Sequence, residues 1–95
     1  MRKLTEQDLI DMVEGETVID GYEVVDVRPK DNCEYSGIIL GENKHGQWVT
    51  WEFRLEKNGM PKVQWGHYSN DKEVAKNDYH CRDKWTHYPM PKSAV

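Results

Sequence analysis

The sequence predicts an α+β fold: a short N-terminal helix, an antiparallel β-meander of three or four strands, and a C-terminal helix packed on one face of the sheet. Three observations support this prediction. Apolar residues recur at helical spacing near the N-terminus and again after residue 70. Between residues 22 and 69 they alternate, or form short runs bounded by turn residues, as in strands. The length of 95 residues is typical of one domain with a modest core.

Aromatic residues supply much of the material for that core. The chain is polar, with 37% hydrophobic and 32% charged residues, but it contains four Trp, five Tyr and one Phe. Each buried ring removes roughly 150 to 250 Å² from water. We therefore expect residues 1–88 to form a single domain, and residues 89–95, the Pro-rich end of the chain, to form a loose tail.

The first helix is predicted from its start and stop signals. Thr5 can cap the helix, and Asp8, three residues later, can reach back to the cap. Gly15 is a typical stop. Between them runs an apolar stripe at helical spacing that needs a surface to lie on: Leu9, Ile10, Met12 and Val13.

The middle of the chain predicts strands. Residues 22–28 and 35–41 are two such segments, separated by a loop at 29–34. "NKHG" at 43–46 suits a four-residue hairpin loop in which the glycine takes a positive φ. Residues 47–56 then alternate. One face carries Val49, Trp51, Phe53 and Leu55, and the other carries Trp48, Thr50, Glu52, Arg54 and Glu56.

The next turn sets the register of the following strand. "KNG" at 57–59 fits a three-residue loop with Gly59 in the left-handed conformation. A two-residue loop would slip the register by one and split the hydrophobic set between the two faces, which sheets avoid. We therefore expect the three-residue loop. The opposed pairs that follow from it are Phe53–Val63, Trp51–Trp65 and Val49–His67.

A second helix is predicted from about residue 71 to residue 83. Asn70 followed by Glu73 matches a capping box. The apolar side consists of Val74, Cys81 and Trp85, extended by Ala75 and Tyr79. Asp78 falls inside that stripe, a conflict that the sequence does not resolve. The predicted core contains Leu9, Val13, Ile38, Leu40, Val49, Trp51, Phe53, Val63, Trp65 and Val74.

Charge is distributed unevenly along the chain. The net charge is −4, but residues 1–56 hold 13 acidic and 6 basic residues, a net of −7, whereas residues 57–95 hold 4 and 7, a net of +3. An acidic half can face a basic partner. The alternative is that the two halves simply have solvent-exposed faces of different charge, without a partner for either. The candidate acidic surface consists of Glu6, Asp8, Asp11, Glu14 and Glu16.

Other features narrow the compartment and the class of partner. The net charge disfavours nucleic acid as a partner, because nucleic-acid binders usually carry a basic face. No signal peptide and no apolar run long enough to span a membrane is visible, so we expect no membrane partner. The two cysteines are then expected to be reduced in a cytoplasmic protein.

Metal and catalytic motifs are weak. His80 and Cys81 are adjacent, so on a helix they point about 100° apart, and no Cys-x-x-Cys or His-x-x-x-His pair occurs. Cys33 lies in a polar loop, but no spacing places a base beside it. We expect His67 to be a core-face histidine bonded to a backbone group or a carboxylate. No catalytic residue, no metal and no cofactor is predicted.

One aromatic feature suggests binding. In the expected register, Trp48 and Tyr68 oppose each other on the outer face, beside the small pair Thr50 and Gly66. Two rings that flank a shallow notch can stack a base, a nucleotide or a partner side chain. The other interpretation is that a helix or loop covers this face and that Gly66 is small to allow close approach.

These residues also resemble a known group of proteins. The segments "VTW" at 49–51 and "WGHY" at 65–68, followed by Asp71, Ala75, Asp78-Tyr79 and Arg82, are similar to small uncharacterised proteins of phages and mobile elements. The resemblance covers about residues 35–83 and implies a hairpin followed by an acidic helix. That group has no established activity, so it assigns a role to no residue. Small acidic phage proteins are often binders that block host machines, including anti-CRISPR and antirestriction proteins.

We therefore predict a non-enzymatic protein-binding module of phage or mobile-element type, in the cytoplasm of a bacterial host. Its expected partner is a host protein, and inhibition of a host-defence protein is the sharpest version of this hypothesis. The alternative is a small-ligand or single-stranded nucleic-acid binder that uses the aromatic notch. The sequence leaves the oligomeric state open.

Overall fold

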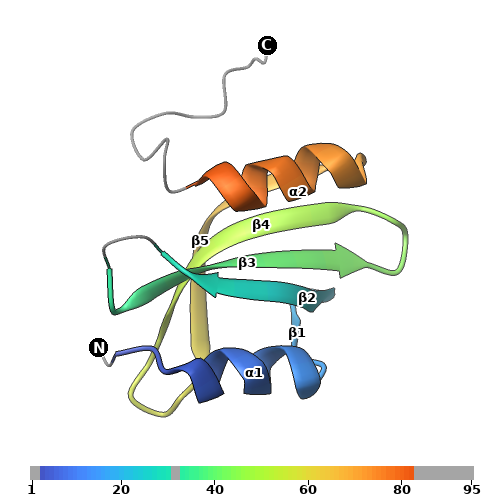
Figure 1. The fold of residues 1–95 in the computed structure, drawn as a ribbon. Coiled ribbons are helices and arrows are strands. Elements are labelled where there is room, and N and C mark those ends of the chain that lie inside the picture. Colours follow the sequence, from blue (N-terminus) through green and yellow to red (C-terminus); the bar gives the residue numbers. More distant parts are fainter. Residues whose placement is uncertain (1–2, 31–32, 83–95) are drawn as a thin grey trace.

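The computed structural model describes residues 3–30 and 33–82, and it confirms the α+β class. Two helices, α1 (Glu6–Glu14) and α2 (Lys72–Cys81), lie on opposite sides of one antiparallel sheet (Figure 1). The sheet has five strands, and each pairs with its neighbour in the chain. The strands are β1 (Val18–Ile19), β2 (Tyr22–Pro29), β3 (Ser36–Asn43), β4 (Trp48–Leu55) and β5 (Pro61–Ser69). The strand beyond the three or four expected is the two-residue β1.

Helix α1 begins and ends at the predicted signals. The Thr5 hydroxyl accepts a hydrogen bond from the Asp8 backbone N–H at 3.1 Å, and Asp8 Oδ2 accepts one from the Thr5 N–H at 2.9 Å. Both halves of the capping box are therefore formed, and two otherwise unpaired backbone donors are satisfied. At the other end, Gly15 is the C-cap, with its N–H bonded to the Asp11 carbonyl at 2.9 Å.

Removing the capping hydroxyl should weaken the whole domain, because α1 covers one face of the core. Thr5→Ala is expected to lower the free energy of unfolding by about 1 kcal/mol, as for other N-caps. Thr5→Ser keeps the hydroxyl and is the matched control. Urea midpoints measured for both variants test this expectation. Equal midpoints for the alanine and serine variants would contradict a stabilising role of the cap.

The second hairpin turn has the predicted form. The first has the predicted positive φ at Gly46 but begins one residue later than the predicted loop at 43–46, because Asn43 is the last residue of β3. Asn43 donates its N–H to the Gln47 carbonyl across the first turn, and Glu56 donates to Met60 across the second, each at 2.9 Å. Gly46 and Gly59 have φ of 82° and 86°, which a side chain would disfavour. The second turn sets the expected register over the first half of β5, where Leu55 faces Pro61 and Phe53 faces Val63.

A β-bulge changes the register in the second half of β5. Glu52 faces Gln64, but Thr50 faces His67, so Trp65 and Gly66 together stand opposite the single residue Trp51. Trp65 has a φ of 55°, in the left-handed region. A bulge of this kind inserts one residue and reverses the faces beyond it. The predicted Trp51–Trp65 and Val49–His67 pairs are therefore wrong.

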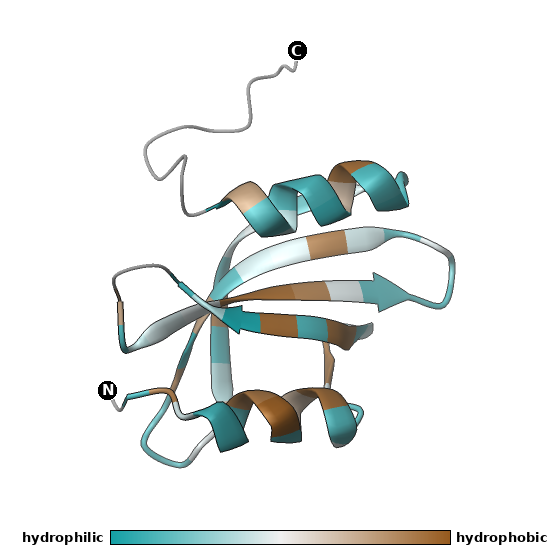
Figure 2. Cartoon of the chain, in the orientation of Figure 1, coloured by the Kyte–Doolittle hydropathy of each residue, from teal (hydrophilic) through white to brown (hydrophobic). Residues whose placement is uncertain are grey.

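The core consists of two layers, one on each face of the sheet. Seven buried residues form the layer under α1: Met12, Val24, Ile39, Val49, Trp51, Phe53 and Leu55. Five form the layer under α2: Ile38, Leu40, Trp48, Ala75 and Tyr79. The predicted alternation along β4 is correct, but both of its faces are largely buried. Strongly apolar segments lie on α1 and the central strands, whereas α2 is mostly hydrophilic (Figure 2).

Two residues of the predicted core are exposed instead. The side chain of Trp65 is 63% exposed, because the bulge turns it out of the sheet. Val74 is 52% exposed, because α2 directs a different stripe inward. The buried members of the predicted core are Ile38, Leu40, Val49, Trp51 and Phe53, and Leu9, Val13 and Val63 are half-buried beside them. The prediction omitted Met12, Val24, Ile39, Trp48, Leu55, Ala75 and Tyr79.

Helix α2 begins one residue later than predicted. Its N-cap is Asp71 rather than Asn70, and Asp71 Oδ1 accepts the N–H of Glu73 at 2.8 Å. Trp85 and the predicted tail at 89–95 lie outside the described residues. In the described part of the chain, neither helix is long and apolar enough to cross a membrane.

Candidate functional site

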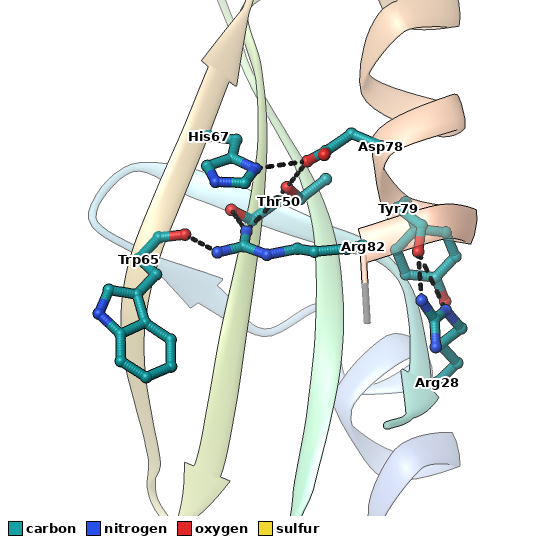
Figure 3. A network of polar contacts seen from close by, with 7 residues as sticks. All are labelled: Arg28, Thr50, Trp65, His67, Asp78, Tyr79 and Arg82. Atoms are coloured by element: carbon teal, nitrogen blue, oxygen red, sulfur yellow. Dashed lines mark hydrogen bonds and ion pairs between the residues drawn. The ribbon is translucent and has the colours of Figure 1, made fainter. Parts of the chain in front are cut away.

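A buried polar network joins α2 to the sheet. Thr50, on β4, donates its hydroxyl hydrogen bond to Asp78 Oδ2, on α2 (Figure 3). His67, on β5, places Nδ1 at 2.9 Å from the same oxygen. Because a carboxylate only accepts hydrogen bonds, His67 donates through Nδ1. The Asp78 carboxylate is buried in the helix–sheet interface, and it accepts hydrogen bonds from two donors on the neighbouring strands β4 and β5.

Arg82 completes the network one turn further along the chain. Its Nη1 donates to the Thr50 carbonyl at 2.6 Å and to the Thr50 hydroxyl at 3.0 Å. Its Nη2 donates to the carbonyl of Trp65. Burial lowers the pKa of the Arg82 guanidinium, while the negative charges of Asp78 and Glu52 act in the opposite direction. Arginine nevertheless keeps its charge at neutral pH, so one cation ties α2 to β4 and β5.

The network resolves the conflict that the sequence presented at Asp78. Asp78 and Arg82 are four residues apart, so they lie on the same side of α2. With Ala75 and Tyr79 they form the inward stripe at positions 75, 78, 79 and 82. Two buried charges of opposite sign are tolerable because each offsets the desolvation of the other. The second oxygen of Asp78, Oδ1, is buried without a hydrogen-bond partner.

A second contact anchors α2 on the same face of the sheet, at strand β2. Arg28, on β2, donates from Nε at 3.0 Å and from Nη2 at 2.6 Å to the Tyr79 carbonyl. Its guanidinium carbon also lies 5.4 Å from the centre of the Tyr79 ring. Burial raises the pKa of the Tyr79 hydroxyl, and nearby Asp26 raises it further. Polar contacts thus supply much of the docking of a helix whose exposed side is hydrophilic.

Trp65 is held out from the sheet by this arrangement. Its carbonyl turns toward Arg82, while its indole projects away from the network (Figure 3). Left-handed backbone costs on the order of 1 to 3 kcal/mol for a residue other than glycine and persists only where the surroundings impose it. The other two tryptophans of the described residues, Trp48 and Trp51, are buried. A strained residue with an exposed aromatic ring marks the candidate functional site.

Gly66 shows why the bulge forms here. A Cβ added at Gly66 would lie 2.8 Å from Trp51 Nε1 and 2.8 Å from the Tyr68 ring. The absence of a side chain lets these two rings approach edge to face, with centroids 6.5 Å apart. Tyr22 packs against both, at 5.6 Å from Trp51 and 6.0 Å from Tyr68. The edge of this cluster is open, because Tyr68 is 62% exposed.

The structure does not bring the four residues of the predicted notch together. Trp48 faces Ser69 rather than Tyr68 and is buried under α2, where Lys72 Nζ lies 5.8 Å from its ring centre. Thr50 is fully buried in the polar network. Tyr68 and Gly66 lie on the α1 face with Trp51. One inserted residue moved Tyr68 to the opposite face, so the expected geometry of the notch is wrong.

The predicted acidic residues do gather on and beside α1. Glu6, Asp11, Glu14 and Glu16 are exposed. Asp11 also accepts a hydrogen bond from the Gln7 side-chain amide at 2.8 Å. Asp8 is half-buried and serves the capping box, so it contributes less to the outer surface. The outer side of α1 is therefore an acidic surface, on the face of the sheet opposite α2.

The remaining candidates for chemistry stay apart. Cys33 and Cys81 are free thiols. Hydrogen bonds from Tyr35 and Ser36 lower the pKa of the Cys33 thiol. Within residues 3–30 and 33–82, no group of three or more His, Cys, Asp or Glu side chains is placed to hold a metal ion.

Sequence reasoning missed the roles of Trp65 and Arg82. A glycine inside a strand often marks a bulge, so the Trp65-Gly66 pair contained a usable signal. For Arg82 the signal was its four-residue spacing from Asp78, which places opposite charges on one side of a helix.

In comparisons with known proteins, no family model, no curated protein and no solved structure matches the chain. The functional inference therefore rests on the geometry of these residues.

Proposed function

We propose that this protein is a non-enzymatic protein-binding module whose contact surface is centred on Trp65. The observation that carries this proposal is the exposed indole on a strained backbone, fixed from behind by the buried Arg82. Tryptophan and tyrosine are enriched among the residues that dominate binding energy at protein interfaces. A side chain on a fixed backbone also loses less entropy on binding than one on a mobile segment.

The position of Trp65 on an edge strand supports this function. β5 pairs only with β4, so its outer edge is open in the described part of the chain. Tyr68, three residues further along the same strand, is a second exposed aromatic residue. The bulge and Pro61 interrupt the edge, which disfavours simple strand addition. Side-chain anchors are therefore a better basis for binding here than backbone pairing.

The acidic surface of α1 supports the sharper version of the proposal. In this version, the protein is of phage or mobile-element type and inhibits a host-defence protein in the bacterial cytoplasm. Glu6, Asp11, Glu14 and Glu16 would attract a basic region of that host protein and speed association. Trp65 would supply the short-range contact. The two surfaces lie on different parts of the fold, so they can be tested separately.

Trp65→Ala is the decisive substitution. In capture experiments from bacterial host lysate, we expect loss of at least 2 kcal/mol of binding energy, about a thirtyfold fall in affinity for the captured partner. The melting temperature should change little, because the ring is exposed. Met60→Ala is the matched control, since Met60 is 61% exposed at the other end of the hairpin. Undiminished capture of the same partner by Trp65→Ala would contradict the proposal.

A salt series separates the two surfaces. Binding driven by the acidic surface of α1 should weaken steeply as ionic strength rises, because exposed charges are screened. Binding driven by Trp65 should persist. A partner that is lost in high salt but unaffected by Trp65→Ala would assign the interface to α1 instead.

A further inference from the structure

A cationic groove lies at the turn end of the β4–β5 hairpin, and it points to a function beyond protein binding. Its volume is about 520 Å³. Three of its residues are cations and only one is an acid; the lining consists of Arg54, Glu56, Lys57, Asn58, Lys62 and Gln64. Arg54 and Lys62 are exposed and alternate with the core residues Phe53 and Val63. They therefore lie on the α2 face, in a part of that face that the helix leaves open.

The positive charges in this groove are unbalanced. Arg54 and Lys62 stand directly opposite each other on neighbouring strands, an arrangement of like charges that destabilises a sheet. Within the described residues, no carboxylate forms an ion pair with either of them or with Lys57. The neighbouring cation Lys30, by contrast, is paired with Glu52 at 3.0 Å. An anionic ligand would remove the repulsion.

Trp65 supplies an exposed stacking surface on the same strand as Lys62 and Gln64. It follows Gln64, a residue of the groove lining, and lies about 10 Å along β5 from Lys62 at 3.3 Å per residue. Figure 3 shows its indole extending toward the beginning of the strand, which is the direction of the groove. Cations along a groove beside an exposed aromatic ring are the two components of single-strand recognition, in which phosphates meet cations and bases stack.

The acidic half of the protein is not an obstacle to such a ligand. Four of its exposed carboxylates, Glu6, Asp11, Glu14 and Glu16, lie on or beside α1, on the opposite face of the sheet from α2 (Figure 1). The sheet and the helix both separate them from the groove. At physiological salt, electrostatic effects decay over about 8 Å, so the local charge of the groove outweighs the net charge of the chain.

We propose that the groove and Trp65 together bind single-stranded nucleic acid. Arg54, Lys57 and Lys62 contact phosphates, and one base stacks on the exposed indole. An acidic protein segment would satisfy the cations but would not need the ring, and a duplex keeps its bases stacked internally. Those two ligands therefore serve as discriminating competitors.

Fluorescence anisotropy with a labelled oligothymidylate of about 12 nucleotides tests the proposal in low salt. Arg54→Glu replaces a like-charge pair with an opposite-charge pair, so its melting temperature should equal or exceed that of the wild type. Its affinity for the oligonucleotide should nevertheless fall more than tenfold. Lys44→Glu, in the exposed β3–β4 turn, makes the same change of net charge and is the matched control. It should bind nearly as the wild type does.

Two further measurements separate phosphate contacts from stacking. If about three phosphates are contacted, a plot of the logarithm of the association constant against the logarithm of the salt concentration should have a slope of about −2. Arg54→Glu removes one phosphate contact and should make this slope shallower. Trp65→Ala should weaken binding by about 5- to 150-fold, the range for one stacked base. Absence of binding, equal loss in Lys44→Glu, or equal competition by duplex DNA or by polyglutamate would overturn the proposal.

Discussion

Replacing Trp51 with alanine is expected to lower the free energy of unfolding by about 3 to 5 kcal/mol. Trp51 is only 2% exposed and lies in the core layer under α1. Its ring makes edge contacts with Tyr22 and Tyr68, so truncation removes apolar burial and two aromatic contacts together. Domains of this size are typically stable by only about 5 to 15 kcal/mol. The loss would therefore consume a large part of the total stability.

Urea unfolding followed by circular dichroism measures this effect, with Trp65→Ala as the internal comparison. The two tryptophans were expected to pair in the core, but only Trp51 is buried. We expect Trp65→Ala to stay within about 0.5 kcal/mol of the wild type, as exposed substitutions usually do. Trp51→Phe keeps an aromatic ring, so its free energy of unfolding should lie between those of the wild type and Trp51→Ala. Similar losses for both alanine variants would show that the two side chains are equally buried, contrary to the bulged register.

Asp78→Ala is expected to have the second large effect, also about 3 to 5 kcal/mol. The substitution leaves the Arg82 guanidinium buried without its nearest negative charge on the same helix, and such uncompensated charges are strongly destabilising. It also removes the acceptor shared by Thr50 and His67. Helix α2 contributes only Ala75 and Tyr79 to the apolar layer beneath it, so we expect the polar network to supply an important share of the energy that holds α2 on the sheet.

Asn77→Ala is the matched control for this prediction. Asn77 precedes Asp78 on α2, is exposed, and its replacement changes helix propensity by a similar amount. Thermal and urea unfolding of the two variants isolate the contribution of the network. Asp78→Asn, which retains an acceptor oxygen but not the charge, should lose less stability than Asp78→Ala. If Asp78→Ala were no less stable than Asn77→Ala, the network would not be holding α2 on the sheet.

Trp65 connects these stability effects with the two proposed functions. Its carbonyl is one of the acceptors of Arg82, so the network that docks α2 also sets the backbone from which the indole projects. A protein partner and a single-stranded nucleic acid would both contact this ring and would compete for it. Arg54→Glu distinguishes the two ligands, because it should reduce nucleic-acid binding while leaving Trp65 in place.

Local signals in the sequence predicted most of the secondary structure. The α1 capping box, the Gly15 stop and the two hairpin turns depend on contacts within a few residues. They form as expected, except that the first turn begins one residue later than predicted. The two-residue β1 was missed because so short a strand has no periodicity to detect. The first half of β5 has the expected register because it is set by the adjacent turn.

The candidate site was predicted less well, for reasons that lie in packing. Trp48 and Tyr68 were expected on one face, and Trp65 and Val74 in the core. A strict alternation of faces cannot anticipate an extra residue inserted opposite Trp51. Hydrophobicity favoured the stripe through Val74. The structure instead buries Asp78 and Arg82, because their opposite charges attract and both side chains bond to groups of β4 and β5.

The sequence by itself determined the class of fold, the order of its elements and the turns between them, since each depends on backbone preferences of neighbouring residues. Only the tertiary structure decided which side chains face outward around Trp65. That outcome follows from the close approach of the Trp51 and Tyr68 rings over Gly66 and from the hydrogen bond of Arg82 to the Trp65 carbonyl. These contacts join residues from different elements, and their combined energy exceeds the local preference of Trp65 for extended backbone.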